Sequence, residues 1–173
     1  MSETLALVEQ ILDEHKQISG SFDKLGSISS DAAAAAELGS QKTKDYFVPK
    51  SLDDKGEGIH RWKAMLEAIE EGLKSHFERE ETALVAAFRR EGTPDLADAL
   101  DKLLAEHATI NQHIAKLLKD ADDIASGGKM IEVWEGSGWG MKTNVDKLRD
   151  EIMAHAERET VLLGRMKDHL QKS

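Results

Sequence analysis

Apolar residues recur every three or four positions along four stretches of this chain, the spacing typical of the buried face of an amphipathic helix. The stripes predict helices over residues 3–38, 59–90, 94–125 and 140–171. Thr93 and Pro94 suit the start of the third helix, and Ser126 with the two glycines after it suits the end. Because the joint at Gly92 is short, we expect antiparallel neighbours. The pattern therefore predicts an all-α fold, an up-down-up-down four-helix bundle with one domain over residues 1–173.

Two stretches fit this pattern less well. Residues 39–58 form a long connection, which we expect to pack partly through Tyr46, Phe47 and Val48. Asp31, followed by five alanines, is expected to begin a capped extension of the first helix. The glycine-rich residues 134–140 are compatible with a loop or with a glycine-tolerant early part of the fourth helix, and the sequence leaves both open.

Charge and composition narrow the classes of partner. The chain carries 23 Lys and Arg against 33 Asp and Glu, a net charge of −10, which argues against nucleic acid or an anionic membrane as a partner. It has no cysteine, so a metal would have to bind through nitrogen and oxygen. The sequence contains no apolar run long enough for a membrane span and no basic leader, and we expect a cytoplasmic protein.

Each predicted helix carries a histidine on its apolar stripe. The phrase His-x-x-x-Glu occurs twice, and on a helix residues four apart lie on one face, so each pair can offer a nitrogen and a carboxylate to one point. The two remaining histidines each follow a glutamate in similar surroundings, so the chain is a two-fold repeat. The candidate ligands are His15, His76, Glu80, His107, His155 and Glu159.

The six candidate ligands can meet at one depth of the bundle. In an antiparallel bundle the four histidines lie at similar distances from the same end, within about one helical turn. Four imidazoles and two carboxylates in an apolar core would be strongly destabilising without compensation, and a pair of cations provides it. Such a set gives each of two metals about four protein ligands, with positions left open for a small molecule.

The chain resembles the hemerythrin-like family of His/His/Glu cation-binding bundles over roughly residues 5–170. The resemblance rests on the two His-x-x-x-Glu pairs and on His15 and His107. It implies two iron ions in a non-heme di-iron centre with an oxo or hydroxo bridge, Glu80 and Glu159 as bridging carboxylates, and oxygen, nitric oxide or peroxide as visiting ligands. Imidazole and carboxylate do not select iron uniquely, so zinc and manganese stay open.

Two positions differ from the oxygen-carrying hemerythrins. Those proteins have a second histidine where this chain has Asn111, and their last carboxylate is an aspartate five residues after the last histidine, whereas Glu159 follows His155 by four. The His4Glu2 set is similar to the branch that includes di-iron proteins linked to repair of iron centres. The leading hypothesis is binding or reduction of a small oxidant, which includes a peroxide- or nitric-oxide-consuming enzyme. A sensor with an unknown protein partner and a metal-handling module are the alternatives.

The remaining ionisable residues are interpreted as structural. We expect His60 and His113 to point away from the site, and His169 to lie near a helix end, so none is placed among the ligands. Glu14 and Glu106 are expected to be solvated charges that point sideways. Most of the arginines are expected to face outward, which disfavours a dry ion pair as the role of the buried glutamates.

Overall fold

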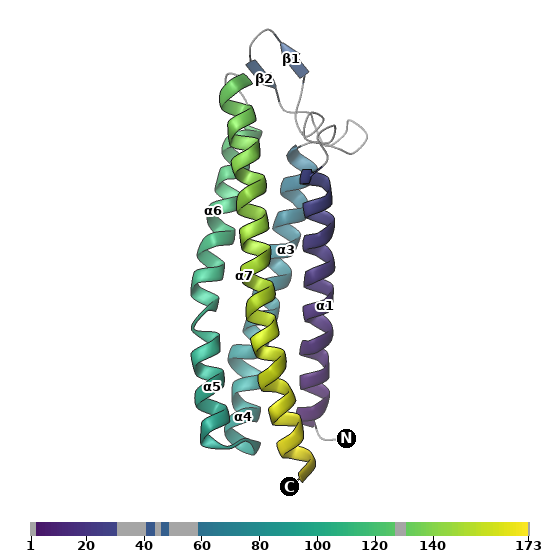
Figure 1. Ribbon diagram of the computed structural model, residues 1–173, viewed down its shortest axis with the longest axis vertical. Coiled ribbons are helices and arrows are strands. Elements are labelled where there is room, and N and C mark those ends of the chain that lie inside the picture. The colour runs from purple at the N-terminus through teal and green to yellow at the C-terminus, as the bar shows by residue number, and fades with distance from the viewer. Residues whose placement is uncertain (1–2, 31–40, 44–45, 49–58, 127–130, 173) are drawn as a thin grey trace.

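The computed structural model describes residues 3–30, 41–43, 46–48, 59–126 and 131–172. Nearly all of these residues are helical (Figure 1). The elements in chain order are α1 (Glu3–Ser30), β1 (Gln41–Thr43), β2 (Tyr46–Val48), α3 (Ile59–Arg79), η1 (Glu80–Leu84), α4 (Val85–Glu91), α5 (Pro94–Leu104), α6 (His107–Ala125) and α7 (Ile131–Lys172).

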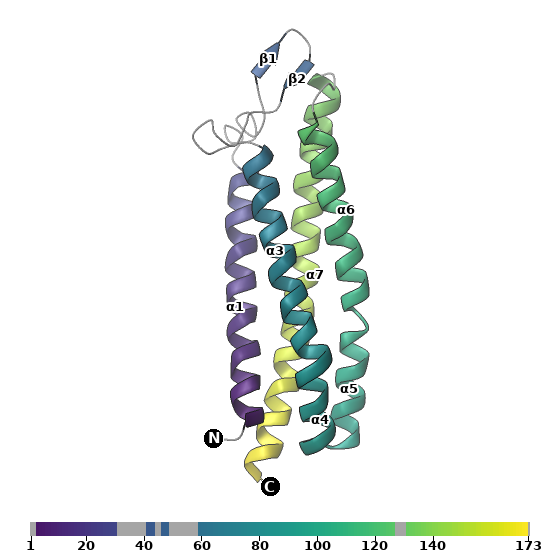
Figure 2. The same cartoon turned by 180° about the vertical axis from the view of Figure 1, so that it is seen from behind.

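The helices form the expected antiparallel bundle. α1 runs up from the N-terminus, α3 to α4 run down, α5 and α6 run up, and α7 returns, so that both termini lie at one end (Figure 1). The chain thus forms four columns, which are α1, α3 with η1 and α4, α5 with α6, and α7. Each column packs on two neighbours, in the cyclic order α1, α3, α6, α7, which is also visible from behind (Figure 2). The predicted all-α, up-down-up-down four-helix bundle is confirmed.

A short hairpin lies at the end opposite the termini. β1 and β2 pair antiparallel, with Gln41 opposite Val48 and Thr43 opposite Tyr46. The hydrophobic pattern did not predict these strands, because each has only three residues. The expected packing of the side chains of residues 46–48 lies outside what the structure describes.

Three helix boundaries can be compared with the sequence pattern. Thr93 caps α5, its Oγ1 accepting from the Leu96 N–H at 3.3 Å, and Pro94 occupies the first turn. The expected extension of the first helix over residues 31–38 lies outside the described residues. The last helix begins at Ile131, earlier than the expected 140, and passes through the glycine-rich segment. Glycine costs about 1 kcal/mol in a helix interior but does not break it, which explains the difference.

Two columns are not regular α-helices at the level of the histidines. In the second column, η1 is a π-helical turn, in which the Val85 N–H donates to the Glu80 carbonyl. In the third column, Ala105 and Glu106 form a turn that separates α5 from α6, and the Glu106 N–H donates to Leu103 at 3.1 Å. Both columns were expected to be continuous helices, 59–90 and 94–125. Hydrophobic periodicity cannot detect a one-residue change in backbone winding, and such irregularities are frequent at functional sites.

The hydrophobic core has two parts. One cluster, which includes Phe22, Trp62 and Ile152, lies on the hairpin side of the candidate ligand histidines along the helices. The other, which includes Ile11, Phe88 and Met166, lies on the side of the termini. Between them, each column contributes at least one buried or nearly buried histidine or glutamate, so a polar layer divides the core.

Candidate metal centre

The structure brings all six candidate ligands into this polar layer. Side chains that could hold a cation form two overlapping sets, and within each set the potential ligand atoms all lie within 4.8 Å of one another. Glu80 belongs to both sets. The first set is His15, His76, Glu80 and Glu159, and the second is Glu80, His107 and His155. Both glutamates were expected to be shared, whereas Glu159 appears in the first set alone.

The imidazole Nε2 atoms converge on the carboxylates. Glu80 Oε1 lies 2.8 Å from His76 Nε2, and Glu80 Oε2 lies 3.1 Å from His107 Nε2. His15 Nε2 lies 3.2 Å from Glu159 Oε2 and 3.8 Å from Glu80 Oε1. The two glutamates have no solvent exposure. Four ring nitrogens and two carboxylates thus lie close together, and solvent does not contact either carboxylate.

Three glutamates outside this group orient three of the rings. Glu14 accepts from His76 Nδ1 at 2.8 Å, Glu81 accepts from His107 Nδ1 at 2.8 Å, and Glu106 accepts from His155 Nδ1 at 3.0 Å. Each bond joins two different helical columns. Carboxylates that bind the outer nitrogen of a ligand histidine fix its tautomer and raise its basicity.

The prediction that Glu14 and Glu106 are merely solvated charges was therefore wrong, and the role of Glu81 was not anticipated. A single helix viewed alone places these side chains beside the histidine rather than on it, because their partners come from neighbouring helices. A signal was nevertheless present in the repeat, since the Glu-His dipeptide occurs in both the first and the third helical column.

The directions of the hydrogen bonds test whether a cation fits. An ionised carboxylate only accepts, so Nδ1 of His76, His107 and His155 donates, and the Nε2 of each neutral ring then presents a lone pair. His107 Nε2 and His155 Nε2 face each other at 3.2 Å. Both oxygens of Glu80 are buried and make no hydrogen bond of acceptable geometry. Lone pairs that face one another in a dry space repel unless a proton or a metal ion lies between them, so the donor set fits a cation.

The same crowding shifts the pKa values of the metal-free groups. Burial lowers the pKa of His15, but its contacts with Glu159 and Glu80 outweigh this effect and raise it to about 9. Burial raises the pKa of Glu80, but its contacts with three imidazoles dominate and hold it well below its usual range. Burial, assisted by the charge of Glu80, raises the pKa of Glu159. Protons therefore stay in the metal-free centre at neutral pH, and a metal must displace them.

Among the side chains that the structure describes, no arginine forms an ion pair with either buried glutamate. Within the described residues, Arg79 pairs with Glu14 at 2.9 Å and Arg158 pairs with Glu106, both at the rim of the site. Neither arginine is in an ion pair with Glu80 or Glu159 there, which agrees with the expectation that a dry ion pair is the weaker account.

The other three histidines lie outside both sets. His113 is half exposed and contacts Glu151 at 2.6 Å, while His60 and His169 are partly buried near helix ends.

Comparison with known proteins agrees with this geometry. Residues 6–166 match the family described as Hemerythrin, the hemerythrin HHE cation binding domain. The chain belongs to this family. Searches of curated proteins and of solved structures gave no match. The match covers all six candidate ligands of this hemerythrin-like domain, while the branch of the family is not distinguished by it. None of the helices within the described residues is long and apolar enough to cross a membrane.

Proposed function

We propose that this hemerythrin-like domain holds two iron ions and binds or reduces a small oxidant, either oxygen, nitric oxide or peroxide. One observation supports the proposal above all: two sets of potential ligands share the buried carboxylate of Glu80. A carboxylate shared by two sets is suited to bridging two adjacent ions. Iron in such a centre would supply the electrons for reduction of the visiting molecule.

The chain's own groups would divide between the ions. His15, His76 and Glu159 would hold one ion and His107 with His155 the other, with Glu80 common to both. Three or four protein ligands per ion leave coordination positions open, as in catalytic rather than structural metal sites. The glutamates that bind the outer ring nitrogens would keep Nε2 of His76, His107 and His155 directed inward and deprotonated.

The residues around the proposed metal centre favour a small, weakly polar ligand. The space on the hairpin side of the rings is bordered by Leu73, Phe77 and Ile152, all of them buried. An apolar border excludes bulk water and strengthens electrostatic interactions at the ions. Large or strongly solvated substrates would be disfavoured there.

Protein purified without oxygen from cells grown without added metal tests the proposal. We expect close to two iron ions per chain. We also expect charge-transfer absorption that changes when oxygen, nitric oxide or peroxide is added in turn. Less than about one iron per chain together with no optical response to any of the three would refute the proposal. Stoichiometric zinc or manganese instead of iron would favour metal handling.

A further inference from the structure

The two halves of the repeat are not equivalent in detail. Residues 76–81 and 155–160 align position by position, which places Phe77 opposite Ala156 and Glu81 opposite Thr160. In the first half, the ring of Phe77 stacks on His107 with centroids 3.8 Å apart and planes at 14°, and Glu81 binds the outer nitrogen of that ring. The His107 ring is thereby covered on one face by Phe77, and its Nδ1 is fixed by Glu81.

His15 has neither kind of support. The positions that correspond to the stacking ring and to the outer carboxylate are Ala156 and Thr160, and both lie in a groove together with His15. His15 Nδ1 is buried and has no hydrogen-bond partner among the residues that the structure describes. Its side chain is 10% exposed, against 2 to 3% for the other three ligand histidines. The polar layer is therefore accessible to solvent beside His15.

A groove between α1 and α7 leads to this open side. It has a volume of about 1000 Å³, and its wall includes Gly20, where an added Cβ would meet no atom within 4 Å. A second, inner space of about 10 Å³ lies against His15, His76 and His155. A space of that size is about the smallest that holds one water molecule. Among the described residues, only His15, Met153 and Ala156 line both spaces, and we call these three residues the neck.

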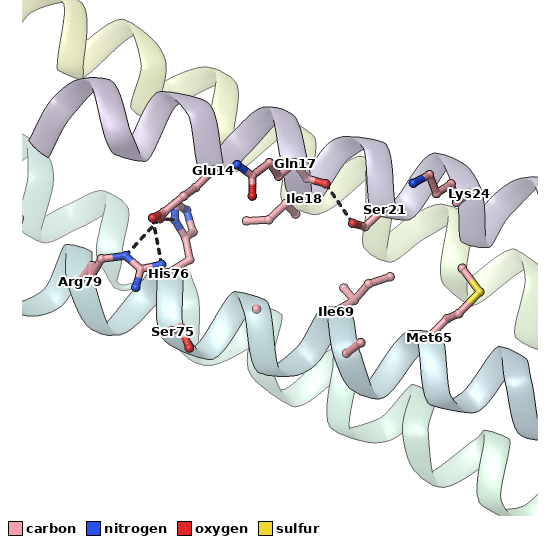
Figure 3. A pocket seen from close by; sticks show the side chains of 12 residues that line it. Glu14, Gln17, Ile18, Ser21, Lys24, Met65, Ile69, Ser75, His76 and Arg79 are labelled. Atoms are coloured by element: carbon pink, nitrogen blue, oxygen red, sulfur yellow. Dashed lines mark hydrogen bonds and ion pairs between the residues drawn. The ribbon is translucent and has the colours of Figure 1, made fainter. Parts of the chain in front are cut away.

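A second groove also reaches the histidines, but it is closed at its inner end. It lies between α1 and α3 and has a volume of about 390 Å³ (Figure 3). There Glu14 joins His76 and Arg79, and the dashed lines of Figure 3 mark these contacts. A molecule entering here would have to break an ion pair that also orients a ligand histidine. In the neck, Met153 and Ala156 are apolar, and the contact of His15 with Glu159 at 3.2 Å is directed inward, away from the groove.

We infer that small uncharged molecules reach the metal centre through the α1–α7 groove, and that Met153 and Ala156 set the size limit for their entry. Met153 is 37% exposed, so its flexible side chain has room to move aside. Ala156 leaves free the place that the aromatic ring occupies in the other half of the repeat. This inference rests on the proposed function only in requiring that a small molecule visits the centre.

Stopped-flow absorbance with nitric oxide on cobalt(II)-loaded protein tests the entrance. The visible bands of cobalt report ligand binding without any iron chemistry, so the entrance is tested even if the proposed oxidant chemistry fails. We expect Met153→Ala to raise the association rate and Met153→Trp to lower it at least about tenfold, because the neck acts on the on-rate. Ala156→Phe should also slow association. Cobalt content and helical circular dichroism should stay at the wild-type level.

Ser75→Phe is the matched control, since Ser75 lies in the α1–α3 groove beside His76 and is exposed. It should leave the association rate unchanged. The inference is overturned if Ser75→Phe slows nitric oxide binding as much as the neck variants do, or if the two Met153 variants leave the rate unchanged. If Ala156→Phe fails to fold, the opposite signs expected for Met153→Ala and Met153→Trp still decide.

Discussion

Removal of the Glu81 carboxylate should weaken one of the two proposed metal positions selectively. Glu81 Oε1 lies 2.8 Å from His107 Nδ1, and among the described residues this carboxylate has no other hydrogen-bond or ion-pair partner, whereas Glu14 and Glu106 also bind arginines. Glu81→Ala therefore removes one interaction with little else. It leaves the His107 ring free to rotate and lowers the basicity of its inner nitrogen.

The expected loss of metal affinity in Glu81→Ala depends on how far Glu81 and His107 are exposed to solvent. Loss of a carboxylate partner of a ligand histidine typically lowers metal affinity about 10- to 100-fold. The His107 side chain is 2% exposed but that of Glu81 is 52% exposed, so water screens part of the charge. We expect the lower limit, about a tenfold loss, which corresponds to about 1.4 kcal/mol. Glu81→Gln keeps an acceptor oxygen but loses the charge, and its effect should be smaller.

Titration of metal-free protein with zinc in competition with a chromophoric chelator measures both affinities. Zinc is used because it has no redox chemistry. One of the two binding steps should weaken in Glu81→Ala and the other should keep its wild-type value. Glu78→Ala is the control, because Glu78 lies three residues earlier on the exposed face of the same column. Equal affinities in the Glu81→Ala and Glu78→Ala proteins would refute the assignment of Glu81 as a positioning residue.

Three further predictions concern the same centre. Glu80→Ala should abolish binding of both ions, whereas Glu78→Ala should leave metal content unchanged, and equal metal contents would show that the helix phase is wrong. Thr160→Glu should give His15 Nδ1 the carboxylate that it lacks and tighten one zinc step up to about tenfold; unchanged affinity would contradict this. In the metal-free protein the pKa of His15 is raised from 6.5 to about 9, so its contribution to stability is complete below pH 6.5 and is lost as the pH rises through 9. Metal affinity should rise over the same pH range, because the metal no longer has to displace a proton from His15. Calorimetry of metal binding in two buffers, at a pH between these values, should detect about one proton released per His15. No proton release would refute the raised pKa of His15.

The hydrophobic pattern was sufficient to predict the bundle, because each column carries a stripe at helical spacing and the cap at Thr93 is local. It also indicated the six residues of the polar layer, since a histidine that interrupts an apolar stripe must point inward with its neighbours. These properties depend on one helix at a time.

The features of the site that the sequence did not reveal depend on contacts between columns or on local backbone winding. Glu14 reaches His76 and Glu106 reaches His155 across helix interfaces, and no periodicity within one helix encodes such a bond. The π-helical turn at Glu80 and the turn before His107 change the winding by about one residue, which the spacing of apolar residues does not resolve. Shared and unshared carboxylates differ by ångströms, so sequence alone could not distinguish Glu80 from Glu159.

The division of the core into two clusters affects how the molecule loses its structure. Each cluster is packed on its own, and the layer between them contains buried polar atoms of His15, Glu80 and Glu159 that have no hydrogen-bond partner among the described residues. The ions would then crosslink the two separately packed ends, and after their removal either end could unfold locally without the other. Amide hydrogen exchange would accordingly record one cooperative block in the loaded protein and two blocks of different protection after chelation.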